Sequence, residues 1–243
     1  MLDHGLDTRA GRLNDRYRHH AATEVLRRAV TDPDLGRVAL VSSFGAESVV
    51  LLHMISVVSP GLPVLFIDTQ MLFSETLDYQ RAVSARLGLT DVRVIGASDA
   101  EVARHDPDGT LHQVDPDACC NFRKSLPLEA ALSGFDAWIT GRKRFQNGQR
   151  SALDFFEPEA PSRLRVNPLA HWRPEDVQDY MIENNLPRHP LVSKGYPSIG
   201  CAPCTSPVGP GEDPRAGRWR GRDKSECGIH FIGGRMVRGK VSA

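Results

Sequence analysis

Val38-Ala-Leu-Val-Ser-Ser-Phe-Gly-Ala-Glu-Ser48 is the stretch that decides the fold of this chain. The apolar run at 38–41 predicts a short buried strand of a parallel sheet, and the mostly apolar residues 48–58 predict the helix that follows it. Small residues fill the turn between them: Ser42, Ser43, Gly45 and Ala46. Such a turn lets backbone N–H groups and the helix N-terminus approach an anion. It is not a Walker loop, because no Gly-Lys-Ser/Thr follows, and an ordinary strand-to-helix turn is the alternative interpretation.

The alternation of strand and helix patterns continues beyond this stretch. Apolar runs at 64–67, 92–95 and 135–140 predict three further strands, and helical patterns cover 74–87 and about 118–132. Alternating strands and helices are typical of a doubly wound, mostly parallel α/β sheet with right-handed crossovers. We therefore expect an α/β fold.

Ligands of doubly wound sheets bind beyond the carboxyl ends of the strands. The segment 42–48, the pair Asp68-Thr69 and the segment 141–144 each follow a predicted strand. Their side chains are polar or basic, whereas the preceding strands are apolar. The sequence therefore predicts that these three segments share one pocket.

The parts of the chain outside this core are less regular. The apolar spacing at 13–30 predicts one surface helix, residues 165–169 an extended piece, and residues 174–184 a helix with proline in its first turn. Pro and Gly are dense from Pro187 onward. We therefore expect one α/β domain over 1–204 and a mobile, loop-rich C-terminal tail over 205–243.

Composition excludes several classes of partner. Lys and Arg number 30 and so do Asp and Glu among 243 residues, which argues against nucleic acid or a membrane as partner. No apolar run approaches the roughly 18–20 residues of a membrane span, and the polar N-terminus does not resemble a signal peptide. We therefore expect a cytoplasmic protein. In that reducing compartment, five cysteines indicate metal binding or redox chemistry rather than disulfides.

The cysteines divide into two groups. Cys119-Cys120 and Cys201-Ala-Pro-Cys204 form two pairs that can meet only through folding. Four thiolates suit zinc or an iron–sulfur cluster, and we favour the cluster because adjacent thiolates can bind different irons of a cubane; inert buried thiols are the alternative. Cys227, with Lys224 and His230 nearby and Gly228 beside it, is a candidate nucleophile rather than a structural thiol.

At this point the chain resembles the assimilatory adenylyl-sulfate reductases of the phosphoadenylyl-sulfate reductase family. The motifs that carry the resemblance run in order along the chain: 42–48, Asp68-Thr69 with Glu75-Thr76, Cys119-Cys-Asn-Phe-Arg-Lys124, Thr140-Gly-Arg-Lys-Arg144, Tyr196-Pro-Ser-Ile-Gly-Cys-Ala-Pro-Cys204, Gly217-Arg-Trp219 and Glu226-Cys-Gly-Ile-His230. The resemblance implies an adenine nucleotide alpha hydrolase-like, Rossmann-like fold. It also implies one [4Fe–4S] cluster per subunit on Cys119, Cys120, Cys201 and Cys204.

The activity that the resemblance implies is reduction of adenosine 5′-phosphosulfate to sulfite and AMP in sulfate assimilation and cysteine biosynthesis. Thioredoxin or a glutaredoxin-like protein would be the reductant, Cys227 would carry an S-sulfocysteine intermediate, and the enzyme would be a homo-oligomer. The paired cysteines usually accompany the substrate without a 3′-phosphate, so the same reaction on 3′-phosphoadenosine 5′-phosphosulfate is the alternative. The expected catalytic residues are Cys227, Lys124 and His230, although His230 fits a plain surface histidine equally well.

The expected substrate site combines the loop after the first strand with several cations, because the substrate carries several negative charges. Its members are Ser42, Ser43, Phe44, Gly45, Ala46, Glu47, Ser48, Asp68, Thr69, Lys143, Arg144, Arg218 and Arg222. Arg123 is expected either as a further cation for the substrate or as the structural partner of a carboxylate. The chain departs from the family pattern at Gln70, where glycine is common, and at Ser74, where proline is common.

Two interpretations from other classes stay open at this stage. An ATP-pyrophosphatase of related fold would use the 42–48 loop, which only loosely follows its Ser-Gly-Gly-x-Asp-Ser pattern, and would leave Cys227 without a role. A zinc-held binding module without catalysis would use only the four paired cysteines. Release of pyrophosphate from ATP supports the first, and a colourless zinc protein supports the second.

Overall fold

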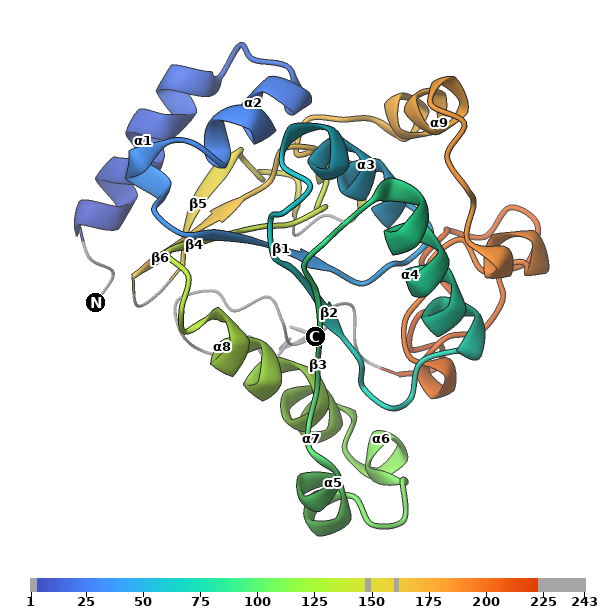
Figure 1. The fold of residues 1–243 in the computed structure, drawn as a ribbon. Coiled ribbons are helices and arrows are strands. Elements are labelled where there is room, and N and C mark those ends of the chain that lie inside the picture. The colour runs from blue at the N-terminus through green and yellow to red at the C-terminus, as the bar shows by residue number, and fades with distance from the viewer. Residues whose placement is uncertain (1–3, 147–149, 160–161, 223–243) are drawn as a thin grey trace, which may run out of the picture.

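The computed structural model describes residues 4–146, 150–159 and 162–222. They form a six-stranded sheet in the order β3-β2-β1-β4-β6-β5, in which β5 alone runs antiparallel to its neighbour (Figure 1). The strands are β1 Val38–Ser42, β2 Val64–Ile67, β3 Val92–Ile95, β4 Ala137–Ile139, β5 Phe156–Glu159 and β6 Arg163–Val166. The predicted doubly wound, mostly parallel α/β sheet is confirmed.

Helices cover both faces of this sheet (Figure 1). The α-helices are α1 His4–Tyr17, α2 Ala22–Ala29, α3 Ser48–Val58, α4 Ser74–Leu87, α5 Asp99–His105, α6 Leu111–Val114, α7 Pro116–Cys120, α8 Leu126–Leu132 and α9 Pro174–Glu183. A π-helical turn, η2 Asn121–Ser125, joins α7 to α8, and short 3-10 helices are η1 Pro33–Leu35, η3 Arg144–Gln146, η5 Pro190–Lys194 and η6 Ala202–Cys204. None of these helices has the length and apolar character that a membrane span requires.

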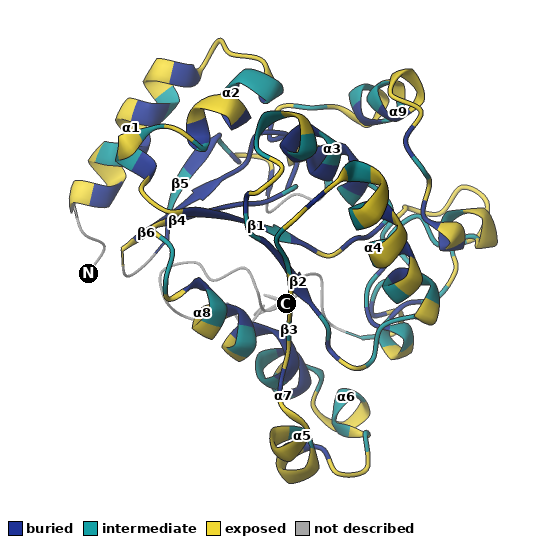
Figure 2. Cartoon of the chain, viewed as in Figure 1, coloured by how far each residue is buried: buried dark blue, intermediate teal, exposed yellow. Residues whose placement is uncertain are grey.

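Side chains alternate between two cores on either side of the sheet. Leu40 of β1 and Val64 and Phe66 of β2 belong to the larger core with α1, α2, α3, α4 and α9. Their neighbours Ala39 and Leu65 face the smaller core, which α8 covers. Because successive residues of a strand point to opposite faces, strands buried on both sides are apolar throughout. Figure 2 shows the outer faces of the helices exposed; strands β1, β2 and β4 are buried almost throughout, whereas the edge strand β3 is partly exposed.

Local signals explain where several elements begin and end. Ser98 and Glu101 form a reciprocal capping box at the start of α5. Pro174 opens α9 as the sequence predicts, because its missing N–H is not needed in the first turn. Gly88 ends α4 in the left-handed conformation, with φ of 63°.

Three predicted elements differ from the structure. The single helix predicted at 13–30 is wrong, because α1 ends at Tyr17 and α2 begins at Ala22. The polar residues 18–20 lie between them, and the extended backbone at Ala21 lets each helix turn its own apolar stripe toward the sheet. The continuous helix predicted at about 118–132 is interrupted by the π-turn η2, and the strand predicted at 135–140 shortens to β4.

The described part of the tail packs against the domain. Residues 205–222 contain no helix or strand, yet the side chain of Trp219 is buried. The backbone N–H of Trp219 donates to the carbonyl of Cys204 at 3.0 Å. An isolated bridge also pairs Thr205 with Arg218. The start of the tail is therefore held beside the second cysteine pair. Residues 223–243, which include Cys227 and His230, lie outside the described residues.

Candidate functional site

A cavity of about 700 Å³ opens at the carboxyl ends of β1, β2 and β4. β2 and β3 lie on one side of β1, and β4 lies on the other side. The crossover direction therefore reverses between β1 and β4, and crevices at such points are where doubly wound sheets bind ligands. The segments 42–48 and 141–143 and the residue Thr69 all line this cavity, apart from Phe44. We call it the nucleotide cavity after the ligand that the sequence predicts for it.

The loop after β1 is organised by its own serines. Ser42 Oγ accepts from the N–H of Phe44 at 3.2 Å, and Ser48 Oγ accepts from the N–H of Gly45 at 3.0 Å. Phe44 adopts a positive φ of 46° and turns its ring into the core, 5.2 Å from the ring of Phe66. The loop thus stays compact, and its hydroxyls and small residues form one wall of the cavity.

Two buried cations from the segment after β4 line the same cavity beside this loop. Lys143 Nζ lies 2.8 Å from Glu47 Oε2, and burial lowers the pKa of this lysine even though Glu47 opposes the shift. Arg142 contacts Glu157 and Asn167. Burial, with neighbouring Arg165 adding to it, lowers the pKa of Arg142 to about 10. Burying these two cations costs solvation free energy. Positive charge buried in a cavity is suited to an anionic ligand.

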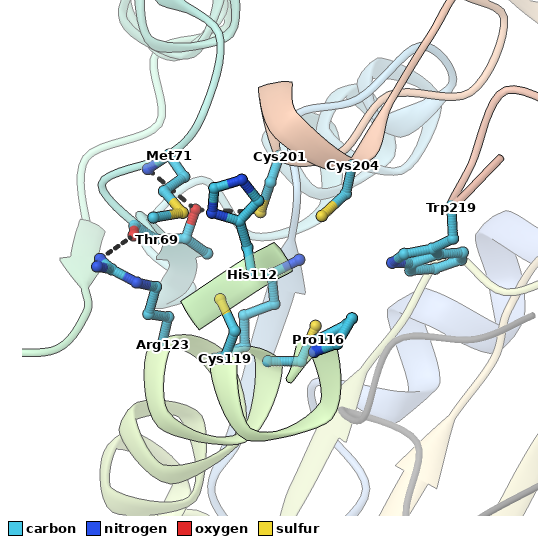
Figure 3. A pocket seen from close by; sticks show the side chains of 11 residues that line it. Thr69, Met71, His112, Pro116, Cys119, Arg123, Cys201, Cys204 and Trp219 are labelled. Atoms are coloured by element: carbon cyan, nitrogen blue, oxygen red, sulfur yellow. Dashed lines mark hydrogen bonds between the residues drawn. The ribbon is translucent and has the colours of Figure 1, made fainter. Parts of the chain in front are cut away.

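A second, smaller cavity collects the two cysteine pairs. Cys119 and Cys120 end α7, whereas Cys201 and Cys204 flank η6, and all four line the same space. Figure 3 shows the sulfur atoms of Cys119, Cys201 and Cys204 pointing toward one another across it. We call this the cysteine cavity. The helix end followed by the π-turn explains how two adjacent cysteines face one centre.

Polar neighbours hold this cavity in place. Thr69 Oγ1 lies 3.2 Å from Cys201 Sγ, and the carbonyl of Thr69 accepts from Arg123 Nη1 at 2.9 Å (Figure 3). Arg123 also pairs with Asp106 at 2.7 Å, with both side chains almost fully buried. Arg123 is therefore a structural partner of a carboxylate, one of the two roles that the sequence allowed. Burial alone would raise the pKa of Asp106, but hydrogen bonds from Arg123 and from the N–H of Leu111 lower it.

Burial favours the protonated form of two of these four thiols, Cys119 and Cys204. Burial raises the pKa of Cys119 to about 11, and the nearby thiols of Cys201 and Cys204 add to the shift. Burial likewise raises the pKa of Cys204. Thiolates at these positions therefore need a positive partner, which metal ligation provides.

The nucleotide and cysteine cavities share a wall. Thr69, Lys124 and Trp219 line both of them. Trp219 holds a positive φ of 51°, and the guanidinium of Arg218 stacks 4.5 Å from its ring centre. Ligands in the two cavities would therefore lie on either side of the same three residues.

The structure gathers most of the predicted site residues. Those that line the nucleotide cavity are Ser42, Ser43, Gly45, Ala46, Glu47, Ser48, Thr69, Lys124, Lys143 and Arg218. The predicted residues that do not line it are Phe44, Asp68, Arg144 and Arg222. Arg144 Nε instead donates to the carbonyl of Leu153 at 2.6 Å, and Arg222 Nη1 donates to that of His112 at 2.6 Å.

The cavity also contains residues that the sequence did not single out as ligand-binding. These are, among others, Thr76, Trp138, Arg142, Arg150 and Arg215. Arg142 begins the basic run Arg142-Lys143-Arg144, and Arg215 begins a second basic segment that ends at Arg222. Arg150 carries no local signal, because it enters the cavity from a segment without strand or helix periodicity.

Comparison with known proteins follows the same lines. The family model described as "Phosphoadenosine phosphosulfate reductase domain" matches residues 37–207. The adenosine 5′-phosphosulfate reductase of Mesorhizobium japonicum is 50% identical over 231 residues, which cover 95% of this chain and 91% of that protein. The solved phosphoadenylyl-sulfate reductase of Candida auris, in a phosphate complex, is 30% identical, with a TM-score of 0.70 over 82% of this chain and 96% of its own.

More distant structures share the fold alone. The FMN adenylyltransferase of Candida glabrata, solved with FMN and an ATP analogue, has a TM-score of 0.56 at 18% identity, covering 86% of this chain and 79% of its own.

Proposed function

The chain belongs to the phosphoadenosine phosphosulfate reductase family, and from this premise we propose that it reduces adenosine 5′-phosphosulfate to sulfite and AMP with electrons from thioredoxin. The name of its Mesorhizobium relative supports this substrate. The observation that carries the proposal is the wall of Thr69, Lys124 and Trp219, which joins a nucleotide cavity to four paired cysteines. The rival ATP-pyrophosphatase and zinc-module interpretations give that shared wall no role.

The four paired cysteines fit an iron–sulfur cluster better than a single metal ion. Their sulfurs face one cavity from two separate segments, which is the donor set of a [4Fe–4S] cluster. Among the described residues, no three His, Cys, Asp or Glu side chains converge tightly enough to hold one ion. A cluster takes its four thiolates around a centre larger than a single ion, which supports the cluster over zinc. When bound, it would supply positive charge to the four thiolates beside Lys124 and Thr69.

The proposed nucleophile is Cys227. It follows Arg222 by five positions in the sequence and lies outside the described residues. Arg222 Nη1 lies 4.0 Å from Cys204 Sγ, at the cysteine cavity. The short stretch of sequence between Arg222 and Cys227 supports a role for this thiol at that cavity. His230 remains a proposed partner for proton transfer, and it lies three residues further on.

The proposed reaction proceeds in two displacements. The Cys227 thiolate attacks the sulfate sulfur, the bond from that sulfur to the bridging oxygen breaks, and AMP leaves with the bond electrons. A thioredoxin thiolate then attacks Cys227 Sγ, and sulfite leaves from the S-sulfocysteine. The second thioredoxin thiol resolves the mixed disulfide, so two thiols supply the two electrons. Lys124, Lys143 and Arg218 would neutralise the charge on the leaving phosphate.

A cytoplasmic location accords with this chemistry. No disulfide joins the four described cysteines, and a thioredoxin-dependent enzyme needs a reducing compartment. The homo-oligomeric state stays a prediction.

The covalent step has a direct test. The holoenzyme is incubated without reductant with substrate radiolabelled in its sulfate sulfur, and protein-bound label is counted. We expect label on the native enzyme and none on Cys227→Ser, with about four irons per chain in both. Turnover by Cys227→Ser would refute the role of this thiol. Parallel assays with and without a 3′-phosphate decide between the two substrates, and faster turnover of the 3′-phosphorylated nucleotide would favour the alternative.

A further inference from the structure

His189 is a buried histidine whose tautomer the structure fixes. Its side chain lies between α4 and η5, only 1% exposed, with the ring of Tyr79 centred 4.7 Å away. Nδ1 accepts the N–H of Leu191 at 3.2 Å. A ring nitrogen that accepts a hydrogen bond carries no hydrogen, so the hydrogen of the neutral imidazole is on Nε2. Burial lowers the pKa of His189 to about 4, which keeps the ring neutral at pH 7.

The tautomer sets the direction of the next hydrogen bond. His189 Nε2 lies 3.1 Å from Thr76 Oγ1. Because Nε2 carries the hydrogen, the ring donates and the threonine oxygen accepts. Among the described residues, Thr76 Oγ1 has no second hydrogen-bond partner, so its own hydrogen is left to donate elsewhere. Thr76 is 1% exposed and lines the nucleotide cavity.

The wall around Thr76 indicates which part of a nucleotide meets it. Ile67, Thr69 and Leu72 line the cavity from the same β2–α4 segment, and no lysine or arginine of this segment does so. The cations come from other elements, so the charged groups of the ligand belong there. The hydroxyl of Thr69 is already engaged by Cys201. Thr76 therefore offers the uncommitted hydroxyl on a mostly apolar wall suited to a purine and its ribose.

We propose that Thr76 donates its hydroxyl hydrogen to an acceptor atom in the adenosine half of the nucleotide, and that His189 is the positioning residue that fixes this direction. The acceptor is a purine ring nitrogen or a ribose oxygen. The inference rests on the proposed function, since it assumes an adenine nucleotide in this cavity. It gives a binding role to Thr76 of the Glu75-Thr76 motif, which has no other role in the proposed reaction.

Calorimetry of AMP binding to the holoenzyme tests the donor. Thr76→Val keeps the shape of the side chain without the hydroxyl, and Thr76→Ser restores the hydroxyl. We expect about 5- to 30-fold weaker AMP binding in Thr76→Val, the range for a lost buried hydrogen bond, and within about threefold of native in Thr76→Ser. The KM for substrate should rise more than kcat falls. Native affinity in Thr76→Val would overturn the proposal.

His189→Asn tests the positioning role. The shorter amide can still accept the N–H of Leu191 as an Asx turn, but it does not reach Thr76. We expect AMP binding to weaken by less than in Thr76→Val, and the double variant to bind no worse than Thr76→Val alone. Unchanged AMP binding in His189→Asn would overturn the assignment of His189.

A third experiment compares the binding of AMP analogues and identifies the atom that accepts the hydrogen bond of Thr76. AMP is compared with its 1-deaza, 3-deaza, 7-deaza, 2′-deoxy and 3′-deoxy analogues on the native holoenzyme. One analogue should bind about 5- to 30-fold more weakly than AMP, and Thr76→Val should abolish that difference. Equal affinity for all six ligands would overturn the proposal even if the variants fail to fold. Failure of the native holoenzyme to bind AMP at all would instead count against the proposed function.

Discussion

The Asp106→Asn substitution would remove one charge from the most deeply buried ion pair beside the cysteine cavity. Asp106 Oδ2 lies 2.7 Å from Arg123 Nη2, and the side chains are 2% and 4% exposed. Removing one partner of a buried pair leaves the other charge without compensation, at a cost of about 3–5 kcal/mol. The amide can still accept the N–H of Leu111, which Asp106 Oδ1 holds at 2.8 Å. We therefore expect a loss at the lower end, about 3 kcal/mol.

The Asp106→Asn substitution should also weaken metal binding by the four cysteines. Arg123 holds the carbonyl of Thr69, and the hydroxyl of Thr69 contacts Cys201 Sγ. A guanidinium that loses its carboxylate will shift toward water and release that carbonyl. Loss of an outer partner of a metal ligand typically costs about 10- to 100-fold in metal affinity. We expect Asp106→Asn to lose iron to a chelator faster than the native protein does.

Thermal unfolding measures the first effect, with an exposed pair as matched control. In a chain of this length, about 3 kcal/mol corresponds to a fall in Tm of about 6–12 °C. Asp91→Asn removes a carboxylate that lies 2.6 Å from Arg93, but those side chains are 33% and 50% exposed. An exposed pair contributes about 0–1 kcal/mol, so its Tm should fall by no more than about 4 °C. Equal shifts in the two variants would refute the argument that burial decides the cost.

Three further predictions follow from single contacts. The pKa of His189 is about 4 in the folded chain and 6.5 ordinarily, so below pH 6.5 the unfolded chain binds a proton that the folded chain excludes. The free energy of unfolding, measured with urea, should therefore fall by about 3 kcal/mol between pH 7 and 4. In His189→Asn it should depend less on pH. Gly200→Ala would place a Cβ 2.3 Å from Arg218 Nη2 and so displace this cavity-lining arginine, and the KM for substrate should rise about tenfold. The control Gly61→Ala, whose Cβ would meet only Thr90 Oγ1 at 3.8 Å, should leave KM unchanged. Lys143→Met should raise KM at least about tenfold with little change in Tm, because Glu47 is 29% exposed and stays hydrated; an unchanged KM would remove Lys143 from the site.

The elements that the sequence predicts best are those whose signals are local. The strands at 64–67 and 92–95 and the helices at 48–58 and 74–87 match the structure residue for residue. Each is a short apolar run or an amphipathic pattern bounded by Gly, Pro or small polar residues. β5 escaped prediction because Phe156-Glu-Pro-Glu159 carries no apolar run. Its pairing depends on β6 and on Asn14 of α1, whose amide exchanges hydrogen bonds with Phe156 at 2.8 and 2.9 Å.

The residues of the candidate site also differ in how well the sequence predicts them, according to whether their signal is local. The cysteine pairs are readable from sequence because thiols at such spacing have few other uses in a reducing compartment. The contacts that organise them are not readable, because Thr69, Arg123 and Asp106 meet only once the chain has folded. Arg144 shows the converse. It stands in the same basic run as Lys143, but the turn after β4 directs it to the carbonyl of Leu153 and away from the nucleotide cavity.

Thr69 links the two cavities chemically, since its carbonyl holds Arg123 and its hydroxyl contacts Cys201 while its side chain lines both spaces. In the proposed reaction, reduction of the sulfo group to sulfite takes two electrons, and the two thiols of thioredoxin would supply both. The cysteine cavity therefore has no electron to deliver in the proposed reaction, and its contribution is to fix Thr69, Lys124 and Trp219 against the nucleotide. Thr69→Val should then weaken iron retention and AMP binding together, whereas Thr76→Val should weaken AMP binding alone. Independent responses in Thr69→Val would mean that the shared wall does not couple the two sites.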